Sequence, residues 1–295
     1  MTASPVPAPL NRKFEWMSFG LGAWCVVVYI FLFIPIGFLI AHSLTKSSAF
    51  EVWAGPPSFR WYPKVFENKQ LMSAIKASFK AALGSTIVAT IIGSMAGITL
   101  ARRKGRWTKP FIVLVLLVLV TPEIVDAIGL LRWFVASELK LNLANTWFSL
   151  RSGILPLVIG QSLFSTAVVI LIVRARMEGL DESLEQAAED LYATPRRAFM
   201  QITLPLVSPA VVASALLAFT LSLDNTIVSN FVNTTGNSTL PAYVFGKTKS
   251  VLKPDIAAAS TMMLGVTLLA LVLVVVVLKR SGDSSSDIAA TITGQ

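Results

Sequence analysis

The composition of this 295-residue chain is that of an integral membrane protein. Hydrophobic residues make up 54% and charged residues 14%, whereas about 25% of a typical soluble domain is charged. The net charge is +9, but the basic residues are scattered between apolar runs rather than gathered in a stripe, which excludes a nucleic-acid partner. With one cysteine, Cys25, and one histidine, His42, the chain cannot form an intramolecular disulfide, and we expect no metal site.

Six apolar segments are long enough to cross a bilayer as helices, which takes about 20 residues each. The first is too long for the core of a signal peptide, so we expect it to be retained. A Pro- and Ala-rich tail at 1–14 and a Ser- and Asp-rich tail at 281–295 are predicted to be disordered, on either side of a membrane domain at 15–280. The predicted spans are 21–41, 71–100, 110–131, 153–173, 210–232 and 256–278.

Small residues recur along the second predicted span. They are Gly84, Ser85, Gly93, Ser94 and Gly97. Small side chains let two helices approach closely within a membrane. We therefore expect this span to pack tightly against a neighbouring helix.

The charge of the connections predicts the orientation in the membrane. Residues 101–109 (ARRKGRWTK) hold five basic residues, and Arg174 and Arg176 follow the fourth span. Because short loops rich in Lys and Arg stay inside, these loops and both termini are predicted to be cytoplasmic. The outer connections would then be 43–69, 132–151 and 233–255. Trp61 and Tyr62, in the first of them, are expected at the membrane surface.

A polar segment, 181–205, separates the fourth and fifth spans and begins with a predicted short helix. Its apolar residues share one helical face, at positions i, i+3, i+4 and i+7. They are Leu184, Ala187, Ala188 and Leu191. Ser183 and Gln186 have the spacing of a capping box, and Asp181 is a second candidate cap. The segment is therefore predicted to be ordered.

A second short helix is predicted after it. Thr194 and Pro195 have the order of a helix cap followed by proline at the first helical position. The helix carries Phe199 and Ile202 and meets Pro205, where we expect it to stop or kink. The segment 181–205 thus forms a helix–turn–helix knob on one side of the membrane.

Polar residues inside the spans are the candidates for contact with a substrate. Glu123 and Asp126 share one face of the third span, and Asp224 lies beside Asn225 in the fifth. A charge near the bilayer centre costs about 2.5–3.5 kcal/mol, so these acids should face the bundle or a water-filled cavity. An acidic and amide lining suits a cationic substrate. The alternative is that the acids pair with a lysine such as Lys76, or lie at an interface.

No nucleotide-hydrolysing motif is present. Gly246, Lys247 and Thr248 have the order that ends a phosphate-binding loop, but Pro241 stands where the first glycine of that motif is required. Signatures of hydrolases are also missing from the sequence. We therefore expect a transport subunit that is not itself an enzyme.

The knob resembles the coupling loop of ABC importer permeases, which reads Glu-Ala-Ala, three residues, Gly, nine residues, Ile-x-Leu-Pro. The matching residues are Ala187, Ala188, Ile202, Leu204 and Pro205. Gln186 stands in place of the glutamate and Tyr192 in place of the glycine. Tyrosine at that turn implies either an ordinary backbone conformation or a strained one.

Nearly the whole folded length resembles the PotC-type permeases of spermidine/putrescine ABC importers. The stretches that carry the resemblance are FLFIPIGFLIAHSLT, TPEIVDAIGLL, the knob and AFTLSLDNTIVSNFV. That family commonly has an acid at Glu123 and Asp-Asp at 224–225, whereas Asp126 is an addition. The resemblance implies a type I importer fold of six helices in the bacterial cytoplasmic membrane. Polyamines are the implied solute, with other small solutes as the alternative.

The resemblance also implies partners and a mechanism. A second similar permease, an external solute-binding protein and two ATPase subunits are expected; ATP and Mg would bind to the ATPases, and this chain would hold no cofactor. The knob would seat in an ATPase cleft and transmit its closure. The implied coupling residues are Leu184, Glu185, Gln186, Ala187, Ala188, Asp190, Leu191, Tyr192, Phe199, Ile202, Leu204 and Pro205. A secondary transporter that couples ions through Glu123 and Asp224 is the competing class, and a channel or structural subunit is a third.

Overall fold

The computed structural model describes residues 12–46, 56–103, 105–141, 149–150, 153–233, 237–247 and 253–280. Five of its helices are long and apolar enough to cross a membrane, and a sixth crossing results if one sharply bent pair of helices is counted as a single span. The five are α1 (Arg12–Ser43), α3 (Lys69–Arg102), α6 (Leu155–Glu178), the continuous run Pro195–Leu223 that ends in α9 (Leu204–Leu223), and α12 (Pro254–Arg280). The predicted all-α membrane fold is therefore confirmed. The predicted tails lie outside the described residues, except that α1 already begins at Arg12.

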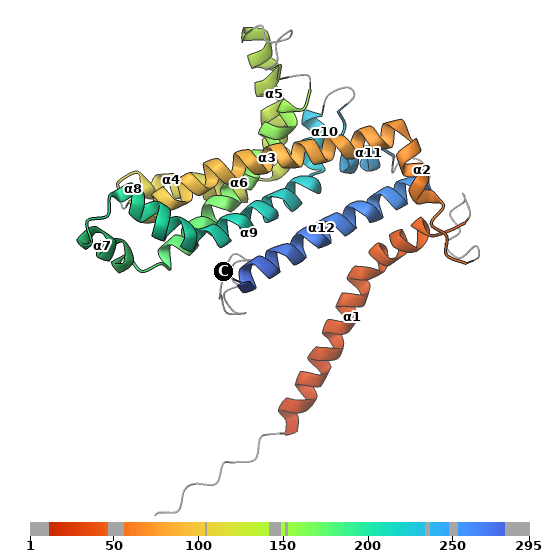
Figure 1. Ribbon diagram of the computed structural model, residues 1–295. Helices are drawn as coiled ribbons and strands as arrows, with labels where there is room; N and C mark the ends of the chain where they lie inside the picture. The colour runs from red at the N-terminus through yellow and green to blue at the C-terminus, as the bar shows by residue number, and fades with distance from the viewer. Residues whose placement is uncertain are drawn as a thin grey trace, which may run out of the picture.

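The bundle is built on a close crossing of α3 and α6, with α9 and α12 alongside (Figure 1). A Cβ added at Gly93 would lie 2.7 Å from the Val169 side chain, and one at Gly97 would lie 2.9 Å from the Ile170 carbonyl oxygen. Both contacts are shorter than real Cβ atoms show, so glycine is what lets the two helices meet. The prediction that the second span packs tightly against a neighbour is confirmed.

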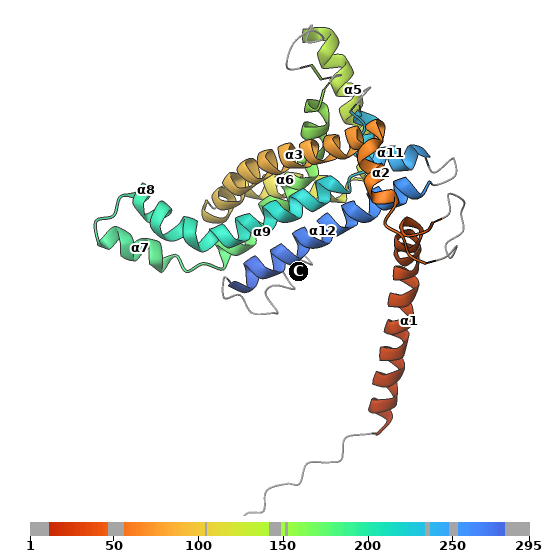
Figure 2. The ribbon, with the colours of Figure 1, turned by 45° about the vertical axis from the view of Figure 1, so that its right-hand side comes forward.

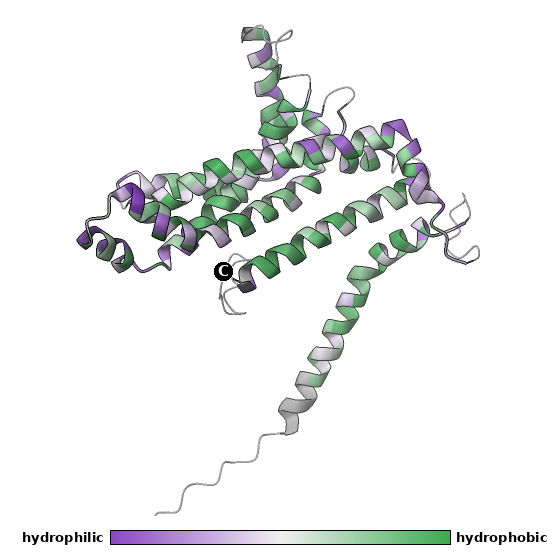
Figure 3. Ribbon diagram, in the orientation of Figure 1, coloured by the Kyte–Doolittle hydropathy of each residue, from purple (hydrophilic) through white to green (hydrophobic). Residues whose placement is uncertain are grey.

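Helix α1 leaves this bundle and stands apart from it (Figures 1 and 2). Every residue from 19 to 38 is exposed, although the helix is apolar along its described length (Figure 3). Such a surface must be covered by lipid or by another protein. Only the end of α1 is fastened, where His42 is buried and the Ser43 hydroxyl lies 3.1 Å from the Tyr62 hydroxyl.

The connection after α1 contains a short helix, α2 (Trp61–Glu67). Trp61 is buried in the core beside α3 and α12, and its Nε1 donates to the Thr45 carbonyl oxygen at 2.7 Å. The expectation that Trp61 rests at the membrane surface is therefore wrong. The indole is held inside because it closes the junction between α1 and the bundle.

The third predicted span is broken. Helix α4 (Thr108–Val120) and α5 (Glu123–Leu141) meet at a bend of 103°. Thr121 is extended, with ψ 132°, because the proline at 122 disfavours a helical conformation in the residue before it. The predicted continuous span at 110–131 is thus wrong, and so is an outer loop from residue 132, because α5 continues as helix to Leu141.

The fifth predicted span is also broken. Helix α9 ends at Leu223, three residues follow, and a short helix α10 (Ile227–Val232) runs on from there. The span therefore begins earlier and ends earlier than the predicted 210–232. The third outer connection contains one more short helix, α11 (Leu240–Lys247). We refer to residues 224–226 as the α9–α10 break and to Thr121 and Pro122 as the α4–α5 break.

Candidate functional site

The two helix breaks lie against each other, and the predicted polar residues are at this meeting point. Glu123 is the first residue of α5, and Asn225 lies in the α9–α10 break. The Asn225 Nδ2 donates to Glu123 Oε1, across 102 residues of chain. Asn225 Oδ1 accepts from the Ser229 backbone N–H at 3.3 Å, which fixes the direction of the amide. Both side chains were predicted as site residues, but their contact was not.

Asp224 opens onto a groove of about 380 Å³. It follows the last residue of α9, and the groove continues between α11 and α12. The other lining residues are Thr226, Leu240, Pro241, Val244, Phe245, Ser260, Met263 and Leu264. Asp126 lies one turn after Glu123 on α5 and is half-buried, outside this lining. The carboxylate of Asp224 is therefore the acid that faces a mainly apolar groove.

The alternative of a lysine partner is not what the structure shows. Among the described residues the ion pairs are Arg102–Glu182, Arg102–Glu185 and Arg174–Glu178. Neither Glu123 nor Asp224 takes part in any of them. No lysine partner for either acid is therefore found among the described residues.

A buried row of neutral polar side chains lies behind the breaks. Ser85 on α3 has its hydroxyl 2.7 Å from that of Ser222 on α9, and Ser222 donates to Gln161 Oε1 on α6. Gln161 Nε2 donates to Ser229 Oγ on α10 at 2.9 Å. The sequence interpretation assigned Ser85 only to packing and overlooked the other three. A glutamine in the middle of an apolar span was the available signal for them.

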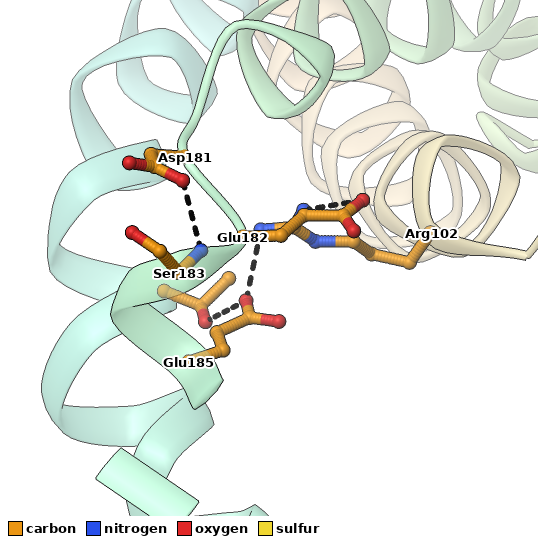
Figure 4. Close-up of polar contacts among 6 residues, drawn as sticks. Arg102, Asp181, Glu182, Ser183 and Glu185 are labelled. Atoms are coloured by element: carbon orange, nitrogen blue, oxygen red, sulfur yellow. Dashed lines mark hydrogen bonds and ion pairs between the residues drawn. The ribbon is translucent and has the colours of Figure 1, made fainter. Parts of the chain in front are cut away.

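At the other end of α3, an arginine fastens the knob to the bundle (Figure 4). Arg102, the last residue of α3, places Nη1 3.2 Å from Glu182 Oε1 and Nη2 3.0 Å from Glu185 Oε1. The Thr203 hydroxyl donates to the same Glu185 oxygen at 2.6 Å. Arg102 was interpreted only as part of a basic loop that sets orientation. It also joins α3 to the first half of the knob, and Glu185 links that half to Thr203 in the second.

The turn inside the knob has a strained residue at its centre. Tyr192 has φ +60°, the left-handed region that favours glycine, and its side chain is 95% exposed. Its N–H bonds to the Glu189 carbonyl at 2.9 Å, and the Ala193 N–H bonds to the Ala188 carbonyl at 2.9 Å. These two bonds form a Schellman motif with Tyr192 at its left-handed position. Of the two possibilities left open for Tyr192, the strained one is confirmed.

Comparison with known proteins decides the family. Residues 69–282 match the family of binding-protein-dependent transport system inner membrane components. The chain belongs to this family. It is therefore a multi-pass inner-membrane permease, a component of a transport system.

Named relatives of this permease cover most of its length. It is 36% identical over 247 residues to the putrescine transport system permease protein PotI of Escherichia coli strain K12, covering 82% of this chain and 86% of that protein. It is 33% identical over 248 residues to the spermidine/putrescine permease PotC of the same strain, covering 84% and 89%. The expected resemblance to PotC-type permeases is confirmed.

Solved structures confirm the importer permease fold. A bacterial ABC transporter involved in the import of alginate has a chain that superimposes with a TM-score of 0.68 at 15% identity, covering 91% of the permease and 96% of that chain. The alginate transporter in complex with a periplasmic protein matches with a TM-score of 0.66 at the same identity. At this identity the likeness concerns the fold alone.

The knob of the permease begins with α7 (Ser183–Asp190), but not by the expected capping box. Ser183 is the first helical residue, and Glu182 before it makes no side-chain cap. Asp181, the second candidate, instead accepts the Ser183 backbone N–H on Oδ1 at 2.8 Å. That hydrogen bond lowers the pKa of Asp181 below its ordinary value, because it favours the charged carboxylate.

The second half of the knob starts as predicted and continues further. Thr194 is extended at the N-cap position and Pro195 opens α8 (Pro195–Ala198), which confirms the predicted start of the helix, although the Thr194 side chain makes no cap hydrogen bond. A π-helical turn, η1 (Phe199–Thr203), then joins α8 to α9, so the chain stays helical through Pro205. The helix therefore does not stop at Pro205, and the irregularity near this proline is the π-helical turn just before it. Proline is accommodated because it is the second residue of α9 and the wider π turn precedes it.

The predicted coupling residues are distributed over the whole knob. Leu184, Glu185, Gln186, Ala187, Ala188 and Asp190 lie on α7, Leu191 and Tyr192 follow it, Phe199 and Ile202 lie on η1, and Leu204 and Pro205 open α9. Ala188 is buried within the chain, whereas Leu191 is 82% exposed. Leu191 and Tyr192 together make an apolar tip that none of the described residues covers.

Proposed function

We propose that this permease is one of two membrane subunits of an ATP-driven importer for polyamines or similar small cations. The observation that carries the proposal is the meeting of the two helix breaks. Through the Asn225–Glu123 contact it brings Glu123 beside the break that carries Asp224, and neither acid has a cationic partner among the described residues. The names of the relatives, a putrescine and a spermidine/putrescine permease, support the same solute class.

The local electrostatics favour a cation beside Asp224. The carboxylate stands just past the C-terminus of α9, where helix carbonyl groups carry partial negative charge. Glu123 stands at the N-terminus of α5, where the helix dipole stabilises its negative charge. One acid thus adds to a negative helix end, and the other lies at a positive helix end. Apolar walls around Asp224 suit the methylene chain of a polyamine.

The remaining parts of the importer would be separate chains. We infer a second permease, an external solute-binding protein and two ATPase subunits that bind ATP and Mg, while this chain holds no cofactor. The basic residues at 101–109 and the knob lie toward the same end of the bundle, which supports a cytoplasmic position for both. Both termini would then be cytoplasmic.

The knob would couple ATP binding to the membrane helices. Its apolar tip, Leu191 and Tyr192, would enter a cleft of the ATPase, and Arg102 would pass the movement to α3. Since α3 packs along α6 and α9, closure of the ATPases would shift these helices as a body and alter access to Asp224. Alternating access would follow from that shift.

Reconstitution of the complete importer tests this function. The permease, its partner subunits and the solute-binding protein are placed in liposomes, and uptake of radiolabelled spermidine and putrescine is measured with and without ATP. ATP-dependent uptake of a polyamine supports the proposal. Stimulation by another solute alone would overturn the polyamine assignment, and uptake driven by an ion gradient without ATPases would overturn the importer mechanism in favour of a secondary transporter.

A further inference from the structure

Gln161 on α6 holds both sides of the α9–α10 break. Its Oε1 accepts from Ser222, two residues before Asp224, and its Nε2 donates to Ser229 Oγ, which follows the break on α10. Gln161 is 2% exposed, and both serines are buried with it. A single side chain therefore spans the interruption in the helix.

The chemistry of an amide suits this position. It presents one acceptor and one donor at a fixed separation, so both serines are satisfied in a single orientation. An apolar residue would leave two buried hydroxyls without this partner, and a carboxylate would bring a charge into a buried site. The preceding residue, Gly160, lets α10 come near enough, since a Cβ there would lie 2.8 Å from Val228 Cγ1.

The contact reaches the acids through Ser229. The hydroxyl of Ser229 is held by Gln161, while its backbone N–H donates to Asn225 Oδ1. Asn225 then directs Nδ2 toward Glu123. A displacement of α10 would therefore rotate Asn225 away from Glu123, and a displacement of the end of α9 would move Asp224.

We propose that Gln161 is a positioning residue for solute recognition: without touching the solute, it sets the geometry in which Asp224 and Glu123 face a cation. The proposal rests on the proposed function, since it assumes that these acids meet the solute. It adds a determinant of affinity on a helix that contributes no acid to the site.

The test compares Gln161→Leu with Thr166→Val in the reconstituted importer. Thr166 lies on the same helix, and its hydroxyl bonds only to the Ser162 carbonyl of α6 at 2.6 Å among the contacts described. Saturation curves of polyamine uptake give KM and the maximal rate separately. Gln161→Leu is expected to raise KM about tenfold, with a smaller change in the maximal rate, because two buried hydrogen bonds are lost. Thr166→Val is expected to leave KM within about twofold.

A second comparison separates positioning from a general loss of structure. Gln161→Leu in a Glu123→Gln background should raise KM by less than it does alone, since the part that acts through the Asn225 contact is already lost and only the part that acts through Asp224 remains. Fully additive effects, or an unchanged KM with a lowered maximal rate, would overturn the proposal. If Gln161→Leu fails to assemble, Ser229→Ala takes its place, with an expected rise in KM of about threefold.

The outcomes also distinguish this inference from the proposed function. If wild-type importer takes up no polyamine, or if Glu123→Gln leaves KM unchanged, the proposed function fails. If Glu123→Gln raises KM while Gln161→Leu and Ser229→Ala behave like Thr166→Val, only the role of Gln161 is overturned.

Discussion

Two sets of polar contacts join helices of this permease. One lies at the knob and the other at the α9–α10 break. Arg102 joins α3 to the knob through ion pairs, and Gln161 joins α6 to both sides of the α9–α10 break through neutral hydrogen bonds. The Arg102 side chain is 20% exposed and its partner Glu182 is 62% exposed, whereas Gln161 is 2% exposed. Charged side chains near water therefore join the segments at the knob, whereas a buried amide joins the helices in the interior.

The difference follows from the cost of losing a partner. The two Arg102 pairs are partly exposed, and ion pairs within reach of water contribute about 0.2–1 kcal/mol, because water solvates either charge when the pair opens. A buried hydrogen-bonding group left without a partner costs about 1–3 kcal/mol. The link at the knob can therefore open and re-form during a transport cycle, while the link behind the break holds its geometry. Single substitutions should be tolerated better at the knob than in the interior.

The largest effect is expected where the buried row ends, at Glu123. Glu123→Ala removes a charge that the Asn225 amide supports and should lower kcat/KM for polyamine uptake about 100-fold, the equivalent of about 2.7 kcal/mol. Asp126→Ala, one turn away and outside the Asn225–Glu123 contact, should cost less than about fivefold. Uptake assays on the two variants check this, and equal losses would place both acids in the path.

Next in size is the tight crossing of α3 and α6. Gly97→Ala would bring a Cβ within 2.9 Å of a backbone oxygen that cannot move aside, and should destabilise the assembled protein by about 1–3 kcal/mol. Gly265→Ala on α12 meets nothing within 4 Å and is the matched control. Thermal unfolding in detergent compares them; a variant at Gly97 as stable as the control would contradict the close approach.

Substitution of Arg102 should cause a smaller loss of uptake, and the loss should appear in the maximal rate rather than in KM. Arg102→Gln opens the link to Glu182 and Glu185 and should reduce the maximal rate of uptake about two- to fivefold with KM unchanged. Arg174→Gln, which breaks a pair within a single helix, should have little effect. Measurements at low and high salt sharpen the comparison. High salt should screen the ion pairs and lower the maximal rate of the wild type toward that of the Arg102 variant. A rise in KM for Arg102→Gln would contradict the prediction that the Arg102 contacts affect the transport rate whereas the Gln161 contacts affect solute affinity.

A gain in local stability is expected at Tyr192. Tyr192→Gly relieves a left-handed backbone and should stabilise the end of α7 by about 1 kcal/mol. Leu191→Gly, at an ordinary φ of −86°, should have the opposite effect. Amide hydrogen exchange of the knob reports both. If Tyr192→Gly also reduces ATPase coupling, the exposed tyrosine side chain is a contact residue as proposed.

The smallest effect concerns pH at the start of α7. The lowered pKa of Asp181 means that its hydrogen bond to Ser183 is present above the ordinary value of 3.8 and is lost as the pH falls through the folded-state pKa. Exchange of the Ser183 amide, corrected for the intrinsic rate, should therefore accelerate in acid. Asp181→Ala should show the faster exchange already at neutral pH, and a pH-independent difference between the two proteins would contradict the assignment.

Much of this architecture was determined by the sequence alone. The length of the apolar runs predicted the membrane helices, because a bilayer requires about 20 apolar residues whatever they pack against. Local signals also sufficed at Gly93 and Gly97, which predicted close packing, and at Thr194 and Pro195, which predicted the start of α8. These features depend on neighbours in the chain, so a sequence displays them.

Only the tertiary structure decided how the interior is joined. The breaks at Pro122 and Asp224 lie inside apolar runs that a hydropathy window cannot divide, and the Asn225–Glu123 contact spans 102 residues. Gln161 and Arg102 carry no local motif, and their roles come from which helices the packing brings beside them. A buried hydrogen bond or an ion pair is specified by position in space, and the packing of α3, α6, α9 and α10 supplies that position.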